Sequence, residues 1–226
     1  LMTASGGGVA LIRIADKKAV FYAFAGGNPH SAEILPDGNI VSSSSTGNFL
    51  LLFTVDTTNF PDNVAVKKYP ISDGHNVVWD KKRQILWAGS DHQLRSYKYN
   101  FDCLKPELVL SDSVLLPGNL HDLFPAHGED ALWLTTNTEV LKLDLATGKF
   151  QSANVKQPQS IKSVSSGPEG FPTIVIHPKE KWWTDEVIDA SGQNIFGENG
   201  LKIYKARWHV SNEFSYPTEH KIETCR

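Results

Sequence analysis

Three histidines recur at nearly equal intervals along this chain of 226 residues. His30, His75 and His121 follow one another at intervals of 45 and 46 residues, and Lys162 stands near the equivalent place of a later repeat. Imidazole can ligate a divalent metal, act as a general base or hold an anion, and an ammonium group can neutralise an anion. We therefore predict that the three histidines could ligate a metal, and that His75, His121 and Lys162 are candidate catalytic groups.

The sequence around the histidines repeats with the same period. A polar turn residue stands nine positions after each histidine, two apolar residues follow it, and another apolar residue stands nineteen positions after the histidine. The three sets are Asn39, Gln84 and Asp130, then Ile40-Val41, Ile85-Leu86 and Ala131-Leu132, and then Phe49, Leu94 and Val140. A period of about 45 residues that contains several short strands is typical of a β-propeller blade.

The elements that carry these residues are predicted to be strands. Short β-rich runs alternate with Gly, Asp and Asn turns, and no window has a helical period over three turns. The sequence thus predicts an all-β propeller of four-stranded antiparallel blades, in a ring of five or six, because a β-sandwich would not explain the period. The blades are expected in one domain over residues 1–226, near 1–27, 28–72, 73–118, 119–158 and 159–226.

Both ends of the chain depart from this repeat. Residues 7–14 and 18–24 are predicted to be the outer strands of a blade whose inner strand is missing. Residues 1–5 have the pattern of the end of a strand, and this abrupt start suggests that a leader and some structure precede Leu1. The last repeat is expected to leave the pattern after His177.

Each repeated histidine opens the first, innermost strand of its blade. Equivalent positions on successive blades face one axis, so His30, His75 and His121 are predicted to converge at one end of the channel, with Lys162 at the rim. The alternative is that each ring forms a structural hydrogen bond within its own blade. A lysine in place of a fourth histidine favours a site for an anion.

Aromatic and cationic residues outside the repeat are further ligand-binding candidates, together with His30. Neighbours on a strand face opposite ways, so one of Trp182 and Trp183 is predicted to be exposed, where it could stack on a sugar ring; the alternative is that both rings are packing residues. Lys205 and Arg207 share a face that either extends the cationic surface or is solvated.

Two carboxylates beside the histidines, Glu33 and Asp122, are predicted to point away from them. Glu33 could equally be a buried partner of a neighbouring blade or a site residue.

Composition limits the partners. The net charge is −3 and no basic stripe is present, which disfavours nucleic acid. No apolar run approaches the length of a membrane span, and the absence of a Gly-rich phosphate loop argues against a nucleotide cofactor. Cys103 and Cys225 match no metal spacing, and could pair if the fold brings them together.

Several motifs resemble those of one family. They are Gly26–Glu33 (GGNPHSAE), Leu35–Asn39 (LPDGN), Trp182–Asp185 (WWTD) and Tyr204–Trp208 (YKARW). Together they resemble uncharacterised secreted β-propellers of Bacteroidetes, which implies a secreted, periplasmic or cell-surface protein. At the level of fold the chain is also similar to propeller polysaccharide lyases such as oligogalacturonate lyase, which place several histidines around a metal.

These observations predict a His- and Lys-lined site for an anionic carbohydrate, which could also hold a divalent metal as a cofactor. The protein would then be a metal-assisted lyase, or a hydrolase, that acts on an acidic glycan. The alternatives are a non-catalytic carbohydrate-binding propeller and a protein-interaction propeller with structural histidines.

Overall fold

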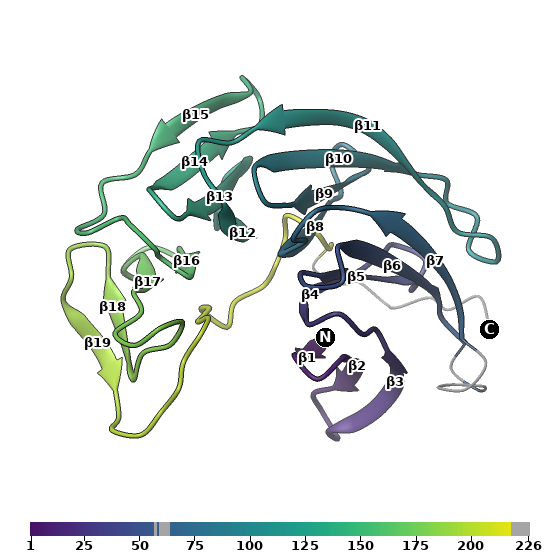
Figure 1. Ribbon diagram of the computed structural model, residues 1–226, viewed down its shortest axis with the longest axis horizontal. Coiled ribbons are helices and arrows are strands. Elements are labelled where there is room, and N and C mark those ends of the chain that lie inside the picture. The colour runs from purple at the N-terminus through teal and green to yellow at the C-terminus, as the bar shows by residue number, and fades with distance from the viewer. Residues whose placement is uncertain (57, 59–63, 218–226) are drawn as a thin grey trace. The chain divides into compact units, whose positions relative to one another are not determined.

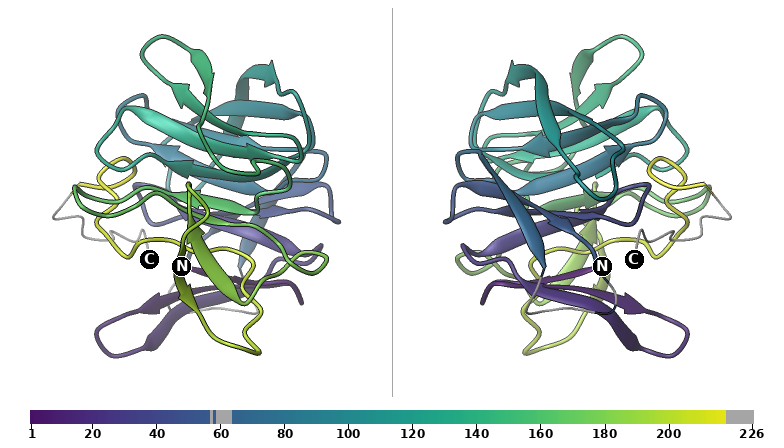
Figure 2. Two further views of the ribbon diagram at one scale, coloured as in Figure 1. Left: turned by 90° about the vertical axis from the view of Figure 1, so that its left-hand side faces the viewer. Right: turned by 90° about the vertical axis from the view of Figure 1, so that its right-hand side faces the viewer.

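The computed structural model describes residues 1–56, 58 and 64–217, and all the regular elements among them are strands. Nineteen strands form five antiparallel sheets, each built from one continuous stretch of chain and so nearly of one colour in Figures 1 and 2. The chain is a β-propeller, and the predicted all-β class is confirmed. The predicted four-stranded blades are confirmed for four of the five sheets, while the first has three strands. The described residues form two compact units that meet in sequence between Leu115 and Leu116. That all the blades belong to one domain stays a prediction.

The first unit contains three sheets. The first has β1 (Met2–Ala4), β2 (Gly8–Arg13) and β3 (Lys18–Phe24). The second has β4 (Pro29–Ile34), β5 (Ile40–Ser44), β6 (Phe49–Thr54) and β7 (Ala65–Pro70). The third has β8 (Asn76–Asp80), β9 (Ile85–Gly89), β10 (Gln93–Tyr99) and β11 (Leu108–Leu115). Each strand pairs with the next one along the chain, so β1, β4 and β8 are first strands at one edge of their sheets.

The prediction that the first sheet lacks its inner strand is wrong. Met2–Ala4 forms β1, which pairs antiparallel with β2 and places Thr3 opposite Val9. The expectation that residues 1–5 form the end of a strand is confirmed by β1, and this strand is the inner partner that was thought to be missing.

The second unit contains two sheets. One has β12 (Leu120–Pro125), β13 (Ala131–Thr136), β14 (Val140–Asp144) and β15 (Lys149–Ser152). The other has β16 (Ser163–Ser165), β17 (Ile174–Ile176), β18 (Glu186–Asp189) and β19 (Asn194–Gly197). The last repeat therefore completes a regular four-stranded sheet, contrary to the expectation that it leaves the pattern. Its outermost strand is exposed along its whole length, and such a strand carries no buried alternation to read.

Apolar side chains fill the space between neighbouring sheets. In the first unit, Leu50 and Leu52 of β6 pack with Trp79 of β8 and Leu86 of β9 in one buried cluster. Trp79 therefore packs between two neighbouring sheets. In the second unit, the partly buried Trp133 packs against a cluster that includes Val164 of the following sheet, and its indole nitrogen donates to Ser166 Oγ at 3.0 Å.

Side chains on one first strand also bind the backbone of the next first strand. Glu33 Oε2 accepts from the backbone N–H of Trp79 at 3.1 Å, and Ser31 Oγ accepts from Val77 at 3.4 Å. In the second unit, Asp122 Oδ2 accepts from the backbone N–H of Val164 at 3.1 Å. We call these contacts inter-blade hydrogen bonds. Glu33 is thus the buried partner of a neighbouring blade that the sequence offered as one of two possibilities.

Cys103 is disulfide-bonded, while Cys225 lies outside the described residues.

Candidate functional site

The repeated histidines stand where the sequence predicted, at the start of a first strand. His30 is the second residue of β4, His75 directly precedes β8, and His121 is the second residue of β12. The first two belong to the first unit, and His121 belongs to the second. The convergence of all three rings on one point stays a prediction.

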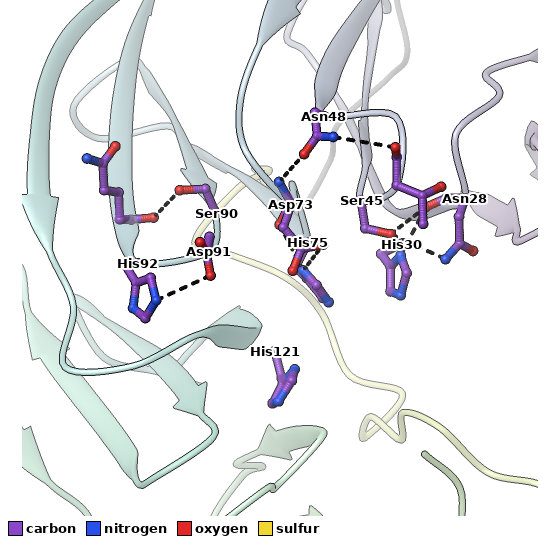
Figure 3. Close-up of polar contacts among 12 residues, drawn as sticks. Asn28, His30, Ser45, Asn48, Asp73, His75, Ser90, Asp91, His92 and His121 are labelled. Atoms are coloured by element: carbon purple, nitrogen blue, oxygen red, sulfur yellow. Dashed lines mark hydrogen bonds and ion pairs between the residues drawn. The ribbon is translucent and has the colours of Figure 1, made fainter. Parts of the chain in front are cut away.

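The turns before His30 and His75 hold both rings in the same way, as Figure 3 shows. His30 Nδ1 lies 3.0 Å from the carbonyl oxygen of Asn28, and His75 Nδ1 lies 2.9 Å from that of Asp73. Both Asn28 and Asp73 adopt a positive φ, of 57° and 45°. Asn48 Oδ1 accepts from the backbone N–H of Asp73 at 2.9 Å and supports the second turn.

This geometry fixes the tautomer of both neutral rings. A carbonyl oxygen only accepts, so Nδ1 must carry the proton and Nε2 must present its lone pair. The rings of His30 and His75 lie with their centroids 4.6 Å apart and tilted by 46°. The bond within the turn is the contact expected of a structural histidine, but it is also the orientation that suits a base or a metal ligand.

The described residues contain no group of three or more His, Cys, Asp or Glu side chains that could hold a metal ion. His30 and His75 supply two imidazoles with a fixed tautomer, which is fewer than the three protein ligands of a catalytic zinc site. The divalent metal at His30, His75 and His121 stays a prediction.

Gly74, between Asp73 and His75, permits the close approach of this turn to β5. A Cβ on Gly74 would lie 2.6 Å from Ser43 Oγ and 3.0 Å from Ile71 Cγ2. We expect Gly74→Ala to lower the free energy of unfolding by about 1–3 kcal/mol, as overpacking does. Denaturant unfolding would measure the loss, and NMR resonances of the His75 ring should shift. Gly6→Ala is the control, since nothing lies within 4 Å of its Cβ, and equal effects of the two variants would contradict this reading.

In the second unit, His121 lies beside a lysine. Lys162 Nζ is 3.1 Å from His121 Nε2, and an ammonium group only donates, so the neutral imidazole accepts through Nε2. The two residues that the sequence proposed as catalytic therefore meet. His75, the third proposed catalytic residue, belongs to the other unit.

Lys205 and Arg207 reach the same strand through a buried carboxylate. Lys205 Nζ lies 2.9 Å from Asp122 Oδ1 and also donates to the His121 carbonyl oxygen at 2.9 Å, while Arg207 Nη2 lies 2.6 Å from Asp122 Oδ1. The alternative that these two cations form a solvated face is wrong, because Asp122 is completely buried and both bind it. We call His121, Asp122, Lys162, Lys205 and Arg207 the basic cluster.

The basic cluster holds more positive than negative charge. Its cationic side chains are Lys162, Lys205 and Arg207, and Asp122, which pairs with the last two, is its one carboxylate. Burial lowers the pKa of Lys162 below its ordinary value, and the charge of Lys205 adds to this. Burial raises the pKa of Asp122, but the charges of Arg207 and Lys205 outweigh it, so the pKa lies below its usual range.

Aromatic rings lie next to the basic cluster. The Trp182 side chain is 49% exposed, and its ring packs edge-on against Tyr204 with centroids 5.9 Å apart. Lys205 Nζ is 5.7 Å from the centroid of the Tyr204 ring. The predicted exposure of one ring of the pair is confirmed for Trp182, whereas Trp183 is half-buried with Lys202 Nζ 5.3 Å from its centroid.

A family model matches residues 1–225 and is described as a family of unknown function, DUF6528. The chain belongs to this family. The resemblance to an uncharacterised family is thereby confirmed, while the source in Bacteroidetes and the motifs quoted for it stay predictions. No curated protein sequence matches the chain.

Solved structures share the fold at low sequence identity. Virginiamycin B lyase from Staphylococcus aureus, as a catalytically inactive variant with quinupristin, is 13% identical with a TM-score of 0.50, over 75% of this chain and 54% of that one. Hydrazine synthase from Kuenenia stuttgartiensis is 12% identical with a TM-score of 0.54, over 84% and 59%. A functionally unknown protein from Desulfotomaculum acetoxidans is 16% identical with a TM-score of 0.51, over 69% and 53%.

This chain therefore spans between about half and three-fifths of the length of these structures. At such identities the likeness shows the fold alone. Among the described residues of this family member, no helix is long and apolar enough to cross a membrane.

Sequence reasoning missed the central role of Asp122. Strand alternation does not apply simply here, because the register shifts between Leu120 and Asp122, and the sequence did not show that Lys205 and Arg207, more than eighty residues later, bind this carboxylate. The available signal was charge, because a buried carboxyl group is either paired with a cation, as Asp122 is, or kept protonated, as Glu33 is.

Proposed function

We propose that this protein binds an anionic carbohydrate at the basic cluster. The observation that carries the proposal is the position of Lys162, whose Nζ contacts His121 Nε2 at 3.1 Å, while Asp122 neutralises part of the charge of Lys205 and Arg207. A carboxylate or sulfate beside Lys162 would receive charge-assisted hydrogen bonds.

The neighbouring aromatic residues support a sugar as the bearer of that anion. Trp182 offers an exposed aromatic face, and it contacts Tyr204, whose ring lies close to Lys205. The apolar face of a pyranose could pack on the indole while its carboxylate approaches Lys162. A hexuronate unit combines both features in one ring, so uronate-containing oligosaccharides are the proposed ligand class.

Calorimetric titration with an acidic oligosaccharide such as oligogalacturonate tests the proposal. We expect wild-type binding that weakens as salt is added, and no binding of a neutral oligosaccharide. Lys162→Met should weaken binding about tenfold or more, since a hydrogen bond to a charged group contributes roughly 1.5–3 kcal/mol. Lys149→Met, on an exposed site in the same unit, is the matched control.

Tryptophan fluorescence provides an independent readout of the same experiment. Acidic oligosaccharide should change the emission of the wild-type protein, and Trp182→Ala should lose most of that change. Binding that is unaffected by both Lys162→Met and Trp182→Ala would place the ligand elsewhere and refute the proposal.

The contact between Lys162 and His121 also favours a catalytic version, a lyase that acts on an acidic glycan. Burial lowers the pKa of Lys162, so a larger fraction of the amine is in the neutral form that can accept a proton near neutral pH. In β-elimination, the base takes the proton from the carbon next to the carboxylate, a double bond forms, the bond to the leaving sugar oxygen breaks, and that oxygen takes up a proton. The unsaturated product absorbs in the ultraviolet, so incubation with oligogalacturonate separates a lyase from a binding protein.

We further propose that the protein works outside the cytoplasm. The disulfide bond at Cys103 supports this, because disulfide bonds persist in oxidising compartments. Thiol labelling in intact cells should leave Cys103 unmodified; labelling would contradict this location.

A further inference from the structure

The stretch Ile203–Trp208, which follows β19 and is yellow in Figure 1, binds β16 through inter-blade hydrogen bonds. The backbone N–H of Ala206 donates to Ser163 Oγ at 3.1 Å, and that of Trp208 donates to Ser165 Oγ at 3.2 Å. These bonds join a side chain on a first strand to the backbone of a later segment, as in the pairs described above.

The positions of donor and acceptor follow one rule in both units. We call the equivalent positions His30, His75, His121 and Lys162 the site positions. The acceptor side chain directly follows one site position, and the donor N–H belongs to the second residue after the next site position along the chain. Ser31 follows His30 and binds Val77, two residues after His75. In the second unit, the acceptor Asp122 follows His121, and its donor Val164 stands two residues after Lys162.

Applied to the next step, the rule identifies a fifth site position. Ser163 directly follows Lys162, and its donor Ala206 stands two residues after Tyr204. A second pair of bonds agrees: Glu33, three residues after His30, binds Trp79, four residues after His75. Likewise Ser165, three residues after Lys162, binds Trp208, four residues after Tyr204.

We propose that Tyr204 is a ligand-contacting residue of the basic cluster and takes the position that His30, His75, His121 and Lys162 take in the preceding blades. The inference rests on the proposed function of that cluster. The Tyr204 ring lies between the exposed Trp182 and the cationic Lys205, at 5.9 Å from the indole centroid and 5.7 Å from Nζ.

This position narrows the ligand class. A compact anion such as sulfate needs only the cations, whereas a hexuronate ring would also pack against an aromatic face and hydrogen-bond a phenol hydroxyl. Tyr204 should therefore matter for hexuronate oligosaccharides and not for sulfate. It is a specificity-determining residue, distinct from the charge that Lys162 provides.

The experiment compares two probes on three proteins. Wild type, Tyr204→Phe and Tyr204→Leu are titrated calorimetrically with sulfate and with oligogalacturonate. Tyr204→Phe keeps the ring and should weaken oligogalacturonate binding about three- to tenfold, the range of one neutral hydrogen bond. Tyr204→Leu should weaken it further, and sulfate binding should change less than twofold in both variants.

NMR spectroscopy provides a second measurement, in which the Tyr204 resonance is assigned by mutation. With carbon-13-labelled tyrosine, the resonance that Tyr204→Phe removes belongs to Tyr204, and it should shift when oligogalacturonate is added. Tyr22→Phe, on β3 in the other unit, is the control and should leave binding unchanged.

The outcomes separate this inference from the proposed function. If Lys162→Met abolishes oligogalacturonate binding while both Tyr204 variants bind as wild type, the proposed function stands and the inference is overturned. If neither probe binds and the Tyr204 resonance does not respond to either, both are overturned.

Discussion

Asp122→Asn is expected to be the most destabilising conservative substitution in the second unit. The amide can still accept a hydrogen bond from Val164, but it no longer neutralises Lys205 and Arg207, whose charged groups bind the buried carboxylate. Removing one partner of a buried ion pair costs about 3–5 kcal/mol, because the remaining charge is left uncompensated. Chemical denaturation at neutral pH would measure the loss.

Two further variants make this prediction specific. Glu198→Gln also removes a carboxylate from the second unit, but from an exposed site, and should change the free energy of unfolding by less than about 0.5 kcal/mol. Adding Lys205→Met to Asp122→Asn removes one uncompensated cation and should recover part of the loss, as a double-mutant cycle would show. If Asp122→Asn is no less stable than Glu198→Gln, the ion pairs contribute nothing.

Because of Glu33, the free energy of unfolding of the first unit is expected to fall as the pH rises from about 4.5 to 8. Burial raises the pKa of Glu33 to about 8, and the N–H groups of Trp79 and Ile34 oppose this shift. The folded state therefore keeps a proton that the unfolded chain loses above its ordinary pKa. The stabilising contribution is complete below about pH 4.5, falls through this window, and is lost above about pH 8.

Glu33→Gln isolates this effect. The amide can still accept from the backbone of Trp79 but does not titrate, so the variant should show a flatter dependence of unfolding free energy on pH. At about 1.4 kcal/mol per pKa unit, the difference between the two proteins should reach a few kcal/mol between pH 5 and 8. Denaturant melts at several pH values would measure it, and parallel pH profiles would contradict the assignment.

Much of the fold could be predicted from the sequence because its signal is periodic. The spacing of His30, His75 and His121 correctly located the starts of three first strands, and long strands such as β10 show clear alternation. The exposed β19 was predicted to be a loop, because none of its residues is buried and so it carries no alternation to be recognised.

The site was only partly predictable, because its contacts link distant parts of the chain. Lys162 was found through its place in the repeat, and it does meet His121. The pairing of Asp122 with Arg207 and the register of Tyr204 depend on how the segment after β19 returns to β16. No local pattern encodes that return, since the path of a long connection is set by packing.

The inter-blade hydrogen bonds have a direction. In the pairs that start from a first strand, the acceptor side chain belongs to the earlier repeat, as with Ser31 and Asp122, and the donor is a backbone N–H of the later segment. Every residue except proline has that N–H, so a newly duplicated repeat would need no special sequence in order to attach. The preceding repeat supplies the acceptor side chain, so a repeat added at the C-terminal end can form these hydrogen bonds with its backbone alone. A repeat added at the N-terminal end must itself contain the Ser, Asp or Glu acceptor.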